Sequence, residues 1–245
     1  MRGRLVESPH SSSWQSLRFL EGNLIVSCQA SAGEPLCAPE HILALSLSAI
    51  AGGAKGLRLE GTENIQHVRK HTELPIIGLI KSPGISGEER LRKVYITASY
   101  NEAEAIAGAG ADIIAMDATG RVRPDGLSIG ELISKVHTNL EKPVWADIST
   151  LADGIAASNA GADVISTTLY GYTEETRLPP EAGPNFKLLQ ELVEHIPQPV
   201  ILEGRIWHPA EVRQAFELGA YACVVGSAIT RPQLITKRFV KALPA

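Results

Sequence analysis

Two short stretches near the C-terminal end decide the fold of this chain: PVILEGR, Pro199–Arg205, and VVGSAITRP, Val224–Pro232. Each is a run of apolar, mostly β-branched residues that ends abruptly in glycine and polar residues, which is typical of a buried parallel strand followed by a loop. Glycine-rich turns after the last two strands of a (β/α)8 barrel are a common phosphate site. Glu203 would lie beside that phosphate, so the pattern indicates an enzyme that acts on a small phosphorylated metabolite.

The same strand pattern recurs eight times along the chain. The expected strands are residues 24–28, 56–60, 75–80, 111–117, 142–148, 162–168, 199–203 and 221–226. Amphipathic stretches separate them, including a helix expected over Pro39–Ala51, and three such stretches end in Gly-Ala, as expected of helix C-caps: Gly110-Ala111, Gly161-Ala162 and Gly219-Ala220. Parallel strands need crossover helices, so the pattern predicts an α/β (β/α)8 barrel. An open doubly wound sheet is the alternative, but the units are even and no early GxGxxG motif is present.

The barrel is expected to be a single domain over residues 22–245, preceded by an N-terminal arm, residues 1–21. This arm is polar and leads into a helix that could cap the barrel floor. The longest irregular stretch, Tyr170–Gly183, follows the sixth strand. Loops of this length in a compact domain are usually functional, and we expect this one to act as a lid.

Composition narrows the class of protein. Of 245 residues, 44% are hydrophobic and 20% charged, and the formal net charge is −4, which gives no indication of a nucleic-acid partner. Three cysteines without CxxC spacing argue against a disulfide framework or a zinc site. The N-terminus lacks the apolar core of a secretory signal, and no apolar run approaches membrane length. We therefore expect a soluble cytoplasmic protein without a membrane partner.

Chemistry in such barrels lies at the C-terminal ends of the strands. The residues expected there are Gln29, Arg58, Glu60, Lys81, Asp117, Asp147, Thr167, Thr168, Glu203, Gly226 and Ser227. Lys81 is either a general base with a lowered pKa, a Schiff-base lysine, or simply a solvated lysine that opens the next loop. Glu203 is the matching acid or base, or else a carboxylate that caps the following helix. Asp117 and Asp147 either bind hydroxyls, orient Lys81, or cap helices.

The expected phosphate site consists of main-chain amides near Gly204 and Gly226–Ser227, with Arg231 as a charged clamp or else as an ordinary exposed residue. His67 and His71 are spaced as a possible metal pair, but they are expected on an outer helix far from the strand ends. We therefore predict no metal site and no cofactor.

Several blocks together resemble one known family. They are IVSCQASAGEPL, GLRLEG, LPIIGLIK, IIAMDATGRVRPDG, WADIST, TTLYGYT, VILEGRIWHPAE and VVGSAITRPQLIT. In this order, from about residue 22 to the C-terminus, they are similar to the N-acetylmannosamine-6-phosphate 2-epimerases of bacterial sialic-acid catabolism.

The resemblance implies a barrel that interconverts N-acetylmannosamine 6-phosphate and N-acetylglucosamine 6-phosphate without metal or nucleotide. It implies that Lys81 and Glu203 are catalytic. It further implies sugar contacts from Gln29, Arg58, Asp147 and Thr168, phosphate contacts from Gly204, Gly226, Ser227 and Arg231, and a homodimer, which is common in the family.

Two positions depart from the family. Members usually carry Arg-Asp after the lysine, where Ser82-Pro83-Gly84 stands here, and a small residue where Tyr170 stands. We expect the first change to alter the stiffness and charge of the loop, and Tyr170 to narrow the pocket or stack on the sugar. Two other functions remain open, a non-catalytic amino-sugar-phosphate sensor and a Schiff-base phosphosugar lyase.

Overall fold

Eight parallel strands close into a barrel in the computed structural model, which describes residues 12–85, 87–179 and 181–244. Each strand pairs with its neighbours in sequence, and β8 pairs with β1. The strands are β1 Leu24–Cys28, β2 Gly56–Glu60, β3 Ile76–Leu79, β4 Ile113–Asp117, β5 Val144–Asp147, β6 Val164–Ser166, β7 Val200–Glu203 and β8 Ala222–Val225. The barrel prediction is therefore confirmed, and the open doubly wound sheet is wrong.

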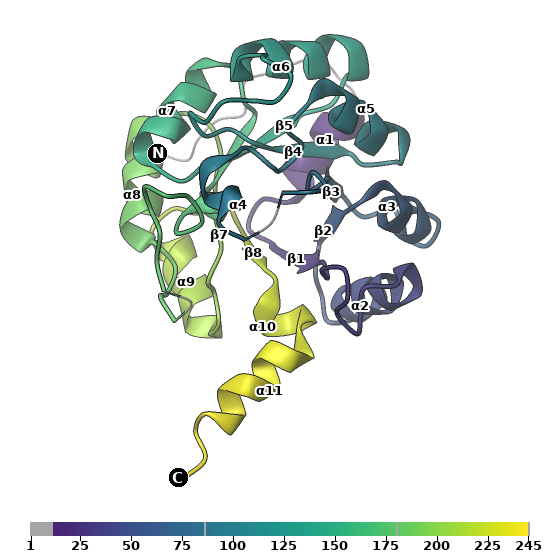
Figure 1. Cartoon of the computed structure of the whole chain (residues 1–245), viewed down its shortest axis with the longest axis vertical. Coiled ribbons are helices and arrows are strands. Elements are labelled where there is room, and N and C mark those ends of the chain that lie inside the picture. Colours follow the sequence, from purple (N-terminus) through teal and green to yellow (C-terminus); the bar gives the residue numbers. More distant parts are fainter. Residues whose placement is uncertain (1–11, 86, 180, 245) are drawn as a thin grey trace.

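Helices surround the barrel, with the short α4 in front of the strands and α1 behind them in Figure 1. The helices are α1 Ser12–Phe19, α2 Pro39–Ala51, α3 Thr62–Arg69, α4 Glu89–Arg92, α5 Tyr100–Gly108, α6 Ile129–Lys135, α7 Leu151–Asn159, α8 Phe186–His195, α9 Pro209–Glu217, α10 Ser227–Thr230 and α11 Pro232–Val240. A π-helical turn, Val136–Leu140, extends α6.

Strand ends are where the sequence prediction needs correction. β1, β2 and α2 have the predicted bounds, whereas the other six strands are one to four residues shorter than expected. The largest difference is in the segment 162–168, where Thr167–Leu169 forms a 3₁₀ turn instead of continuing β6. The sequence predicts a longer strand here because the residues that follow β6 are also buried, and Thr167 is only 1% exposed.

The three Gly-Ala pairs work as predicted. Gly110, Gly161 and Gly219 have φ angles of 102°, 95° and 94°, a left-handed conformation that favours glycine after a helix end. The alanine after each is buried against the barrel. Each pair thus stops a helix and lets the chain enter the next strand at close range.

Alternation along the strands separates two hydrophobic clusters. The interior cluster fills the barrel and includes Ile25, Ile77, Ile113, Trp145, Val164, Ile201 and Val224. The outer cluster packs between strands and helices and takes residues of the opposite phase, among them Val26, Ile76, Ile114, Val144 and Leu202. Strand residues two apart point to the same side, so this phase also fixes where polar residues at the strand ends point.

Helix α1 closes the barrel at the N-terminal ends of the strands. Leu17 and Leu20 are fully buried within the interior cluster. Gly56 of β2 leaves room for this plug, because a Cβ built there would lie 2.6 Å from Leu20 Cδ2. The expected floor cap is thus present in residues 12–20, and residues 1–11 of the expected arm lie outside the described part of the chain.

Helix α11 leaves the barrel and extends away from it (Figure 1). None of its residues is buried, and Phe239 and Val240 are 73% and 57% exposed. Among the described residues, no helix is both long and apolar enough to cross a bilayer.

Replacing Gly78 by alanine is expected to destabilise the fold by about 1–3 kcal/mol, because over-packing a tight core forces neighbours apart. A Cβ at Gly78 would lie 2.3 Å from Ile106 Cγ2 and 2.7 Å from Ala111 Cβ. The measurement is the free energy of unfolding in urea. Gly108→Ala is the control: no atom lies within 4 Å of its Cβ, so we expect no loss of stability, and an equal loss in both variants would contradict the packing argument.

Candidate active site

Polar side chains gather at the C-terminal mouth of the barrel because they share the phase of the interior cluster. Lys81 follows Ile77 and Leu79 at two-residue steps, Asp147 follows Trp145, and Glu203 follows Ile201. The same phase applies to Ser27, Gln29, Arg58, Asp117, Ser166, Thr168 and Gly226. β3 and β7 lie four strands apart in the closed order, so Lys81 and Glu203 approach the mouth from opposite sides.

The centre of this mouth is the guanidinium of Arg58, whose side chain is 1% exposed. Its Nη1 donates to Asp147 Oδ1 at 3.0 Å and to Glu203 Oε2 at 2.9 Å, and its Nη2 donates to Asp147 Oδ2 at 2.5 Å. The guanidinium carbon lies 5.9 Å from the Trp145 ring centroid, at the top of the interior cluster. Burial lowers the pKa of Arg58, but the carboxylates of Asp147 and Glu203 raise it by more than burial lowers it, so the guanidinium stays charged.

Hydroxyl groups from the end of β6 complete this network. Thr168 Oγ1 lies 2.7 Å from Asp147 Oδ1 and 3.0 Å from Glu203 Oε2, and Ser166 Oγ lies 3.3 Å from the same Glu203 oxygen. Thr167 Oγ1 donates to the Glu203 carbonyl at 2.9 Å. The 3₁₀ turn after β6 makes this possible, because it lets Thr167 and Thr168 both turn toward β7 and β5. Glu203 is therefore fixed through both its backbone and its carboxylate.

Two opposing effects set the protonation of Glu203. The net result is a pKa of about 7 for its carboxyl. Burial and the nearby Asp147 raise this pKa, while Arg58, Thr168 and Ser166 lower it. A carboxyl with a pKa near neutrality can both donate and accept a proton at physiological pH.

Lys81 has the complementary shift. Burial lowers the pKa of its ammonium group, Arg58 and Arg90 lower it further, and Glu60 and Glu203 oppose them. Its main-chain amide faces Glu60 Oε1 at 3.4 Å. The mouth thus pairs a lysine biased toward the neutral amine with a carboxyl biased toward the protonated acid, which is the combination that proton transfer requires.

The expected phosphate residues lie on the rim formed by β7 and β8. Glu203 pairs in register with Val224, so Gly204 and Gly226 follow neighbouring strand ends. Gly204 has a φ angle of 102°. The guanidinium of Arg231 is ion-paired with Glu34 in the loop after β1, so it is neither free nor simply exposed.

Gln29 and Asp117 have local partners. Gln29 Nε2 donates to Ser27 Oγ at 2.9 Å on the same strand phase. Asp117 is fully buried, accepts from Thr119 Oγ1 at 2.7 Å and pairs with Arg121 at 2.6 Å. These contacts with its own loop show that the carboxylate of Asp117 organises the loop after β4 and caps no helix.

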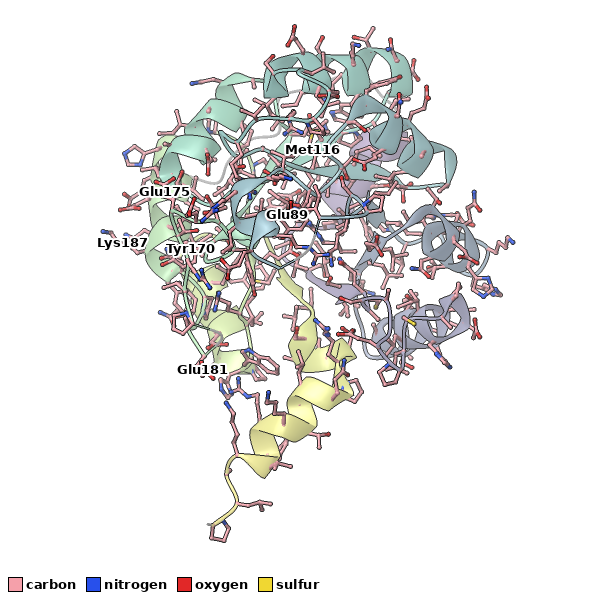
Figure 2. The ribbon with its side chains drawn as sticks, in the orientation of Figure 1. Glu89, Met116, Tyr170, Glu175, Glu181 and Lys187 are labelled. Carbon is pink, nitrogen blue, oxygen red and sulfur yellow. The ribbon has the colours of Figure 1, made fainter. Side chains whose placement is uncertain are left out.

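A long loop and the short helix α4 lie at the rim beside this site. The stretch 170–183 contains no helix or strand among its described residues, as expected. It is paired with α4 through Arg92–Glu174 and with the residue before α4 through Arg177–Glu88. Arg205 holds it from the β7 side through the Gly171 and Pro179 carbonyls. In Figure 2, Glu89 of α4 lies in front of the barrel mouth. The Ser82 hydroxyl, in the departure from the family, donates to Glu102 at 2.9 Å.

Two residues lie elsewhere than the sequence suggests. The half-buried Tyr170 packs against the outer cluster. His71 lies beyond the end of α3, although its ring stays 6.1 Å from that of His67. Among the described residues, no three His, Cys, Asp or Glu side chains gather at metal-binding distances.

Sequence reasoning missed Ser27 and Ser166. Ser27 is the second-last residue of β1 and Ser166 is the last residue of β6. The signal that could have found them is their phase, two residues before Gln29 and Thr168.

Comparisons with known proteins agree with this geometry. The family model described as "Putative N-acetylmannosamine-6-phosphate epimerase" matches residues 42–245. The chain belongs to this family. Proteins named "Putative N-acetylmannosamine-6-phosphate 2-epimerase" from Synechococcus elongatus and Caldanaerobacter subterraneus are 47% and 46% identical over 233 and 225 residues. These alignments cover 94% and 91% of this chain and 97% and 92% of those proteins.

A solved structure of the N-acetylmannosamine-6-phosphate 2-epimerase from Clostridium perfringens has the same fold. It superposes with a TM-score of 0.87 at 41% identity and covers 97% of this chain and 100% of that one. The resemblance found in the sequence blocks is thereby confirmed at the level of the epimerase family.

Glu203 makes stability depend on pH in a predictable direction. Its pKa rises from 4.5 unfolded to about 7 folded, so its stabilising contribution is complete below about pH 4.5 and is lost as pH rises through 7. Relative to Glu203→Gln, the wild-type unfolding free energy should fall by about 2–3 kcal/mol between pH 5 and pH 8. Urea titrations at both pH values measure it.

The matched control is Glu174→Gln, whose carboxylate is 63% exposed and which should keep the wild-type pH dependence. Parallel pH profiles for wild type and Glu203→Gln would show that the carboxyl of Glu203 titrates normally.

Proposed function

We propose that this protein is an isomerase that interconverts N-acetylmannosamine 6-phosphate and N-acetylglucosamine 6-phosphate by proton transfer at C2. The observation that carries the proposal is the placement of Lys81 and Glu203 on opposite sides of the barrel mouth with pKa values shifted toward neutrality from both directions. The printed names of the relatives support the same substrate pair.

The C2 proton becomes acidic only when the sugar ring opens, because C2 then lies next to the C1 aldehyde. In the proposed step, the neutral amine of Lys81 takes this proton, the C–H electron pair forms the C1–C2 double bond, and the π pair of the aldehyde carbonyl moves onto the C1 oxygen, which gives an enolate. Glu203, protonated, returns a proton to the opposite face of C2, and the electron pair moves back to regenerate the aldehyde. Both groups exchange protons with water between turnovers, so no oxidant or cofactor is consumed.

Arg58 and Asp147 are proposed to hold Glu203 for this transfer and to contact the sugar with Gln29 and Thr168. The two Nη atoms of Arg58 already serve Asp147 and Glu203, which supports an orienting role. For the phosphate we propose the main-chain amides of Gly204, Gly226 and Ser227, with Arg231 supplying charge beside them. Remote phosphate binding would fix the orientation of C2 between the acid and the base.

We also propose that the protein acts in the cytoplasm, in the sialic-acid and amino-sugar catabolism that the family resemblance implies, and that it works as a homodimer. The exposed apolar side chains on α11 and beyond it, Phe239, Val240 and Leu243, support the dimer because a second copy could bury them.

The test of the reaction is proton NMR of N-acetylmannosamine 6-phosphate with the protein in deuterated water. We expect the gluco isomer to accumulate with deuterium at C2. Lys81→Ala should lower kcat by about 10²–10⁴-fold, the usual contribution of a general base. Lys187→Ala, 85% exposed on α8 and directed away from the barrel (Figure 2), is the control and should retain full activity.

Near-native turnover by Lys81→Ala would refute the assigned base. Binding without turnover or C2 exchange would indicate a sensor, and a stable adduct after borohydride treatment with substrate would indicate a Schiff-base lyase.

The dimer is tested by light scattering after size-exclusion chromatography. We expect a mass of about twice the 26.2 kDa chain for the wild type, and a shift toward the single-chain mass for Phe239→Asp, because burying an unpaired carboxylate is costly. Gln233→Asp places the same charge at an exposed polar position of α11 and should leave the mass unchanged. A single-chain mass for the wild type would overturn the dimer.

A further inference from the structure

The rim of the barrel between β3 and β4 contains an inserted segment, Val94–Ala98, that belongs to neither strand. β3 and β4 pair directly only through Ile77 and Gly78. Beyond this point the insert takes over: Ile96 forms an antiparallel bridge with Lys81, and its carbonyl accepts from the Asp117 amide at 2.9 Å. The insert is therefore hydrogen-bonded to both strand ends and to the residue that carries the proposed base.

Tyr95 of this insert points into the barrel. Its carbonyl accepts from the Ser82 amide at 2.8 Å, which fixes its backbone next to Lys81. Tyr95 is 9% exposed and belongs to the interior cluster with Leu79 and Trp145. Arg90 covers the ring from α4, with its guanidinium carbon 5.4 Å from the ring centroid. The ring is thus held between the barrel interior and the loop above it.

The hydroxyl of Tyr95 has no hydrogen-bond partner within the part of the chain that the structure describes. By contrast, the partly buried Tyr221 donates to the Leu17 carbonyl at 3.3 Å. The Tyr95 hydroxyl is not fully enclosed, and it interacts electrostatically with Arg58, Asp117 and Asp147 at the mouth. Buried phenols usually find a partner, so an unpaired one beside the charged groups of the mouth points to a ligand.

The surroundings of this hydroxyl are those of the active site. The pKa of the Tyr95 phenol is raised to about 12. Burial and the carboxylates Asp117 and Asp147 raise it, and Arg121 and Arg90 oppose the rise. The phenol therefore remains a neutral hydrogen-bond donor at every pH at which the enzyme would work. A neutral donor suits a sugar hydroxyl or carbonyl oxygen, whereas the phosphate is proposed to bind at β7 and β8, across the barrel.

We propose that the Tyr95 hydroxyl donates a hydrogen bond to a sugar oxygen next to C2 and so sets the orientation of C2 against Lys81. This inference rests on the proposed function and adds a substrate contact to it. The backbone supports it directly, because Tyr95 precedes the residue that pairs with Lys81, so the donor and the base are placed by the same two-stranded segment.

Tyr95→Phe tests the inference because it removes only the hydroxyl and keeps the buried ring. We expect kcat/KM for N-acetylmannosamine 6-phosphate to fall about 10- to 100-fold, since a substrate oxygen loses its partner in a desolvated site. The inhibition constant of inorganic phosphate should not change, because that ion would bind across the barrel. A general loosening of the site would lower kcat/KM and also raise the inhibition constant of phosphate, so this comparison separates the loss of one contact from a structural change.

Tyr100→Phe is the matched control. It makes the same chemical change in the tyrosine that begins α5, where Lys135 lies 5.6 Å from the ring centroid on the outside of the barrel. It should keep wild-type kcat/KM, and thermal unfolding of both variants should stay within a few degrees of the wild type.

Wild-type activity together with a kcat/KM for Tyr95→Phe within twofold of it would overturn the inference and leave the proposed function standing. If the wild type binds N-acetylglucosamine 6-phosphate without converting it, calorimetry takes the place of kinetics: a 10- to 100-fold weaker affinity in Tyr95→Phe supports the contact, and an equal affinity overturns it. A wild type that neither converts nor binds the sugar phosphates overturns both.

Discussion

The structure of the barrel mouth depends on one buried cation, the guanidinium of Arg58. It joins β2 to β5 through Asp147 and to β7 through Glu203, so three strands that are far apart in sequence are connected at one point. Two carboxylates this close would otherwise repel each other, and burying them without a cation would be costly. With Arg58 in place, Asp147 can pair with the cation while Glu203 remains near its protonation midpoint. The chemistry proposed for Glu203 is therefore a consequence of how charge is shared around Arg58.

The same mouth shows how a regular barrel gains an asymmetric site. On one side, a glycine follows each of β7 and β8. On the other, the insert Val94–Ala98 separates the ends of β3 and β4 and brings Lys81 and Tyr95 together. Above them, α4 and the loop 170–183 are joined by ion pairs between exposed side chains. Such pairs are worth little individually, so they fasten the loop only weakly.

Stability and function use different parts of the same strands. Alternate residues of the strands build the interior and outer clusters, and the polar residues of the inward phase lie at or near the C-terminal ends of the strands. Trp145 illustrates the boundary: its ring fills the barrel interior, and Arg58 lies directly above it at 5.9 Å. Chemistry can therefore change at the strand ends without altering the packed layers below.

The sequence by itself determined the fold and the presence of polar candidate residues at the strand ends. Local periodicity is visible in the sequence itself. It accounts for the eight apolar runs, the Gly-Ala helix ends, and the inward phase of Lys81, Asp147 and Glu203. Only the tertiary structure decided which of these residues touch. Arg58 meets partners 89 and 145 positions away, contacts that exist because the barrel closes. The pairing of Arg231 with Glu34, the outward packing of Tyr170 and the inward Tyr95 were equally invisible, since each depends on where a loop packs, and loop packing has no period in the sequence.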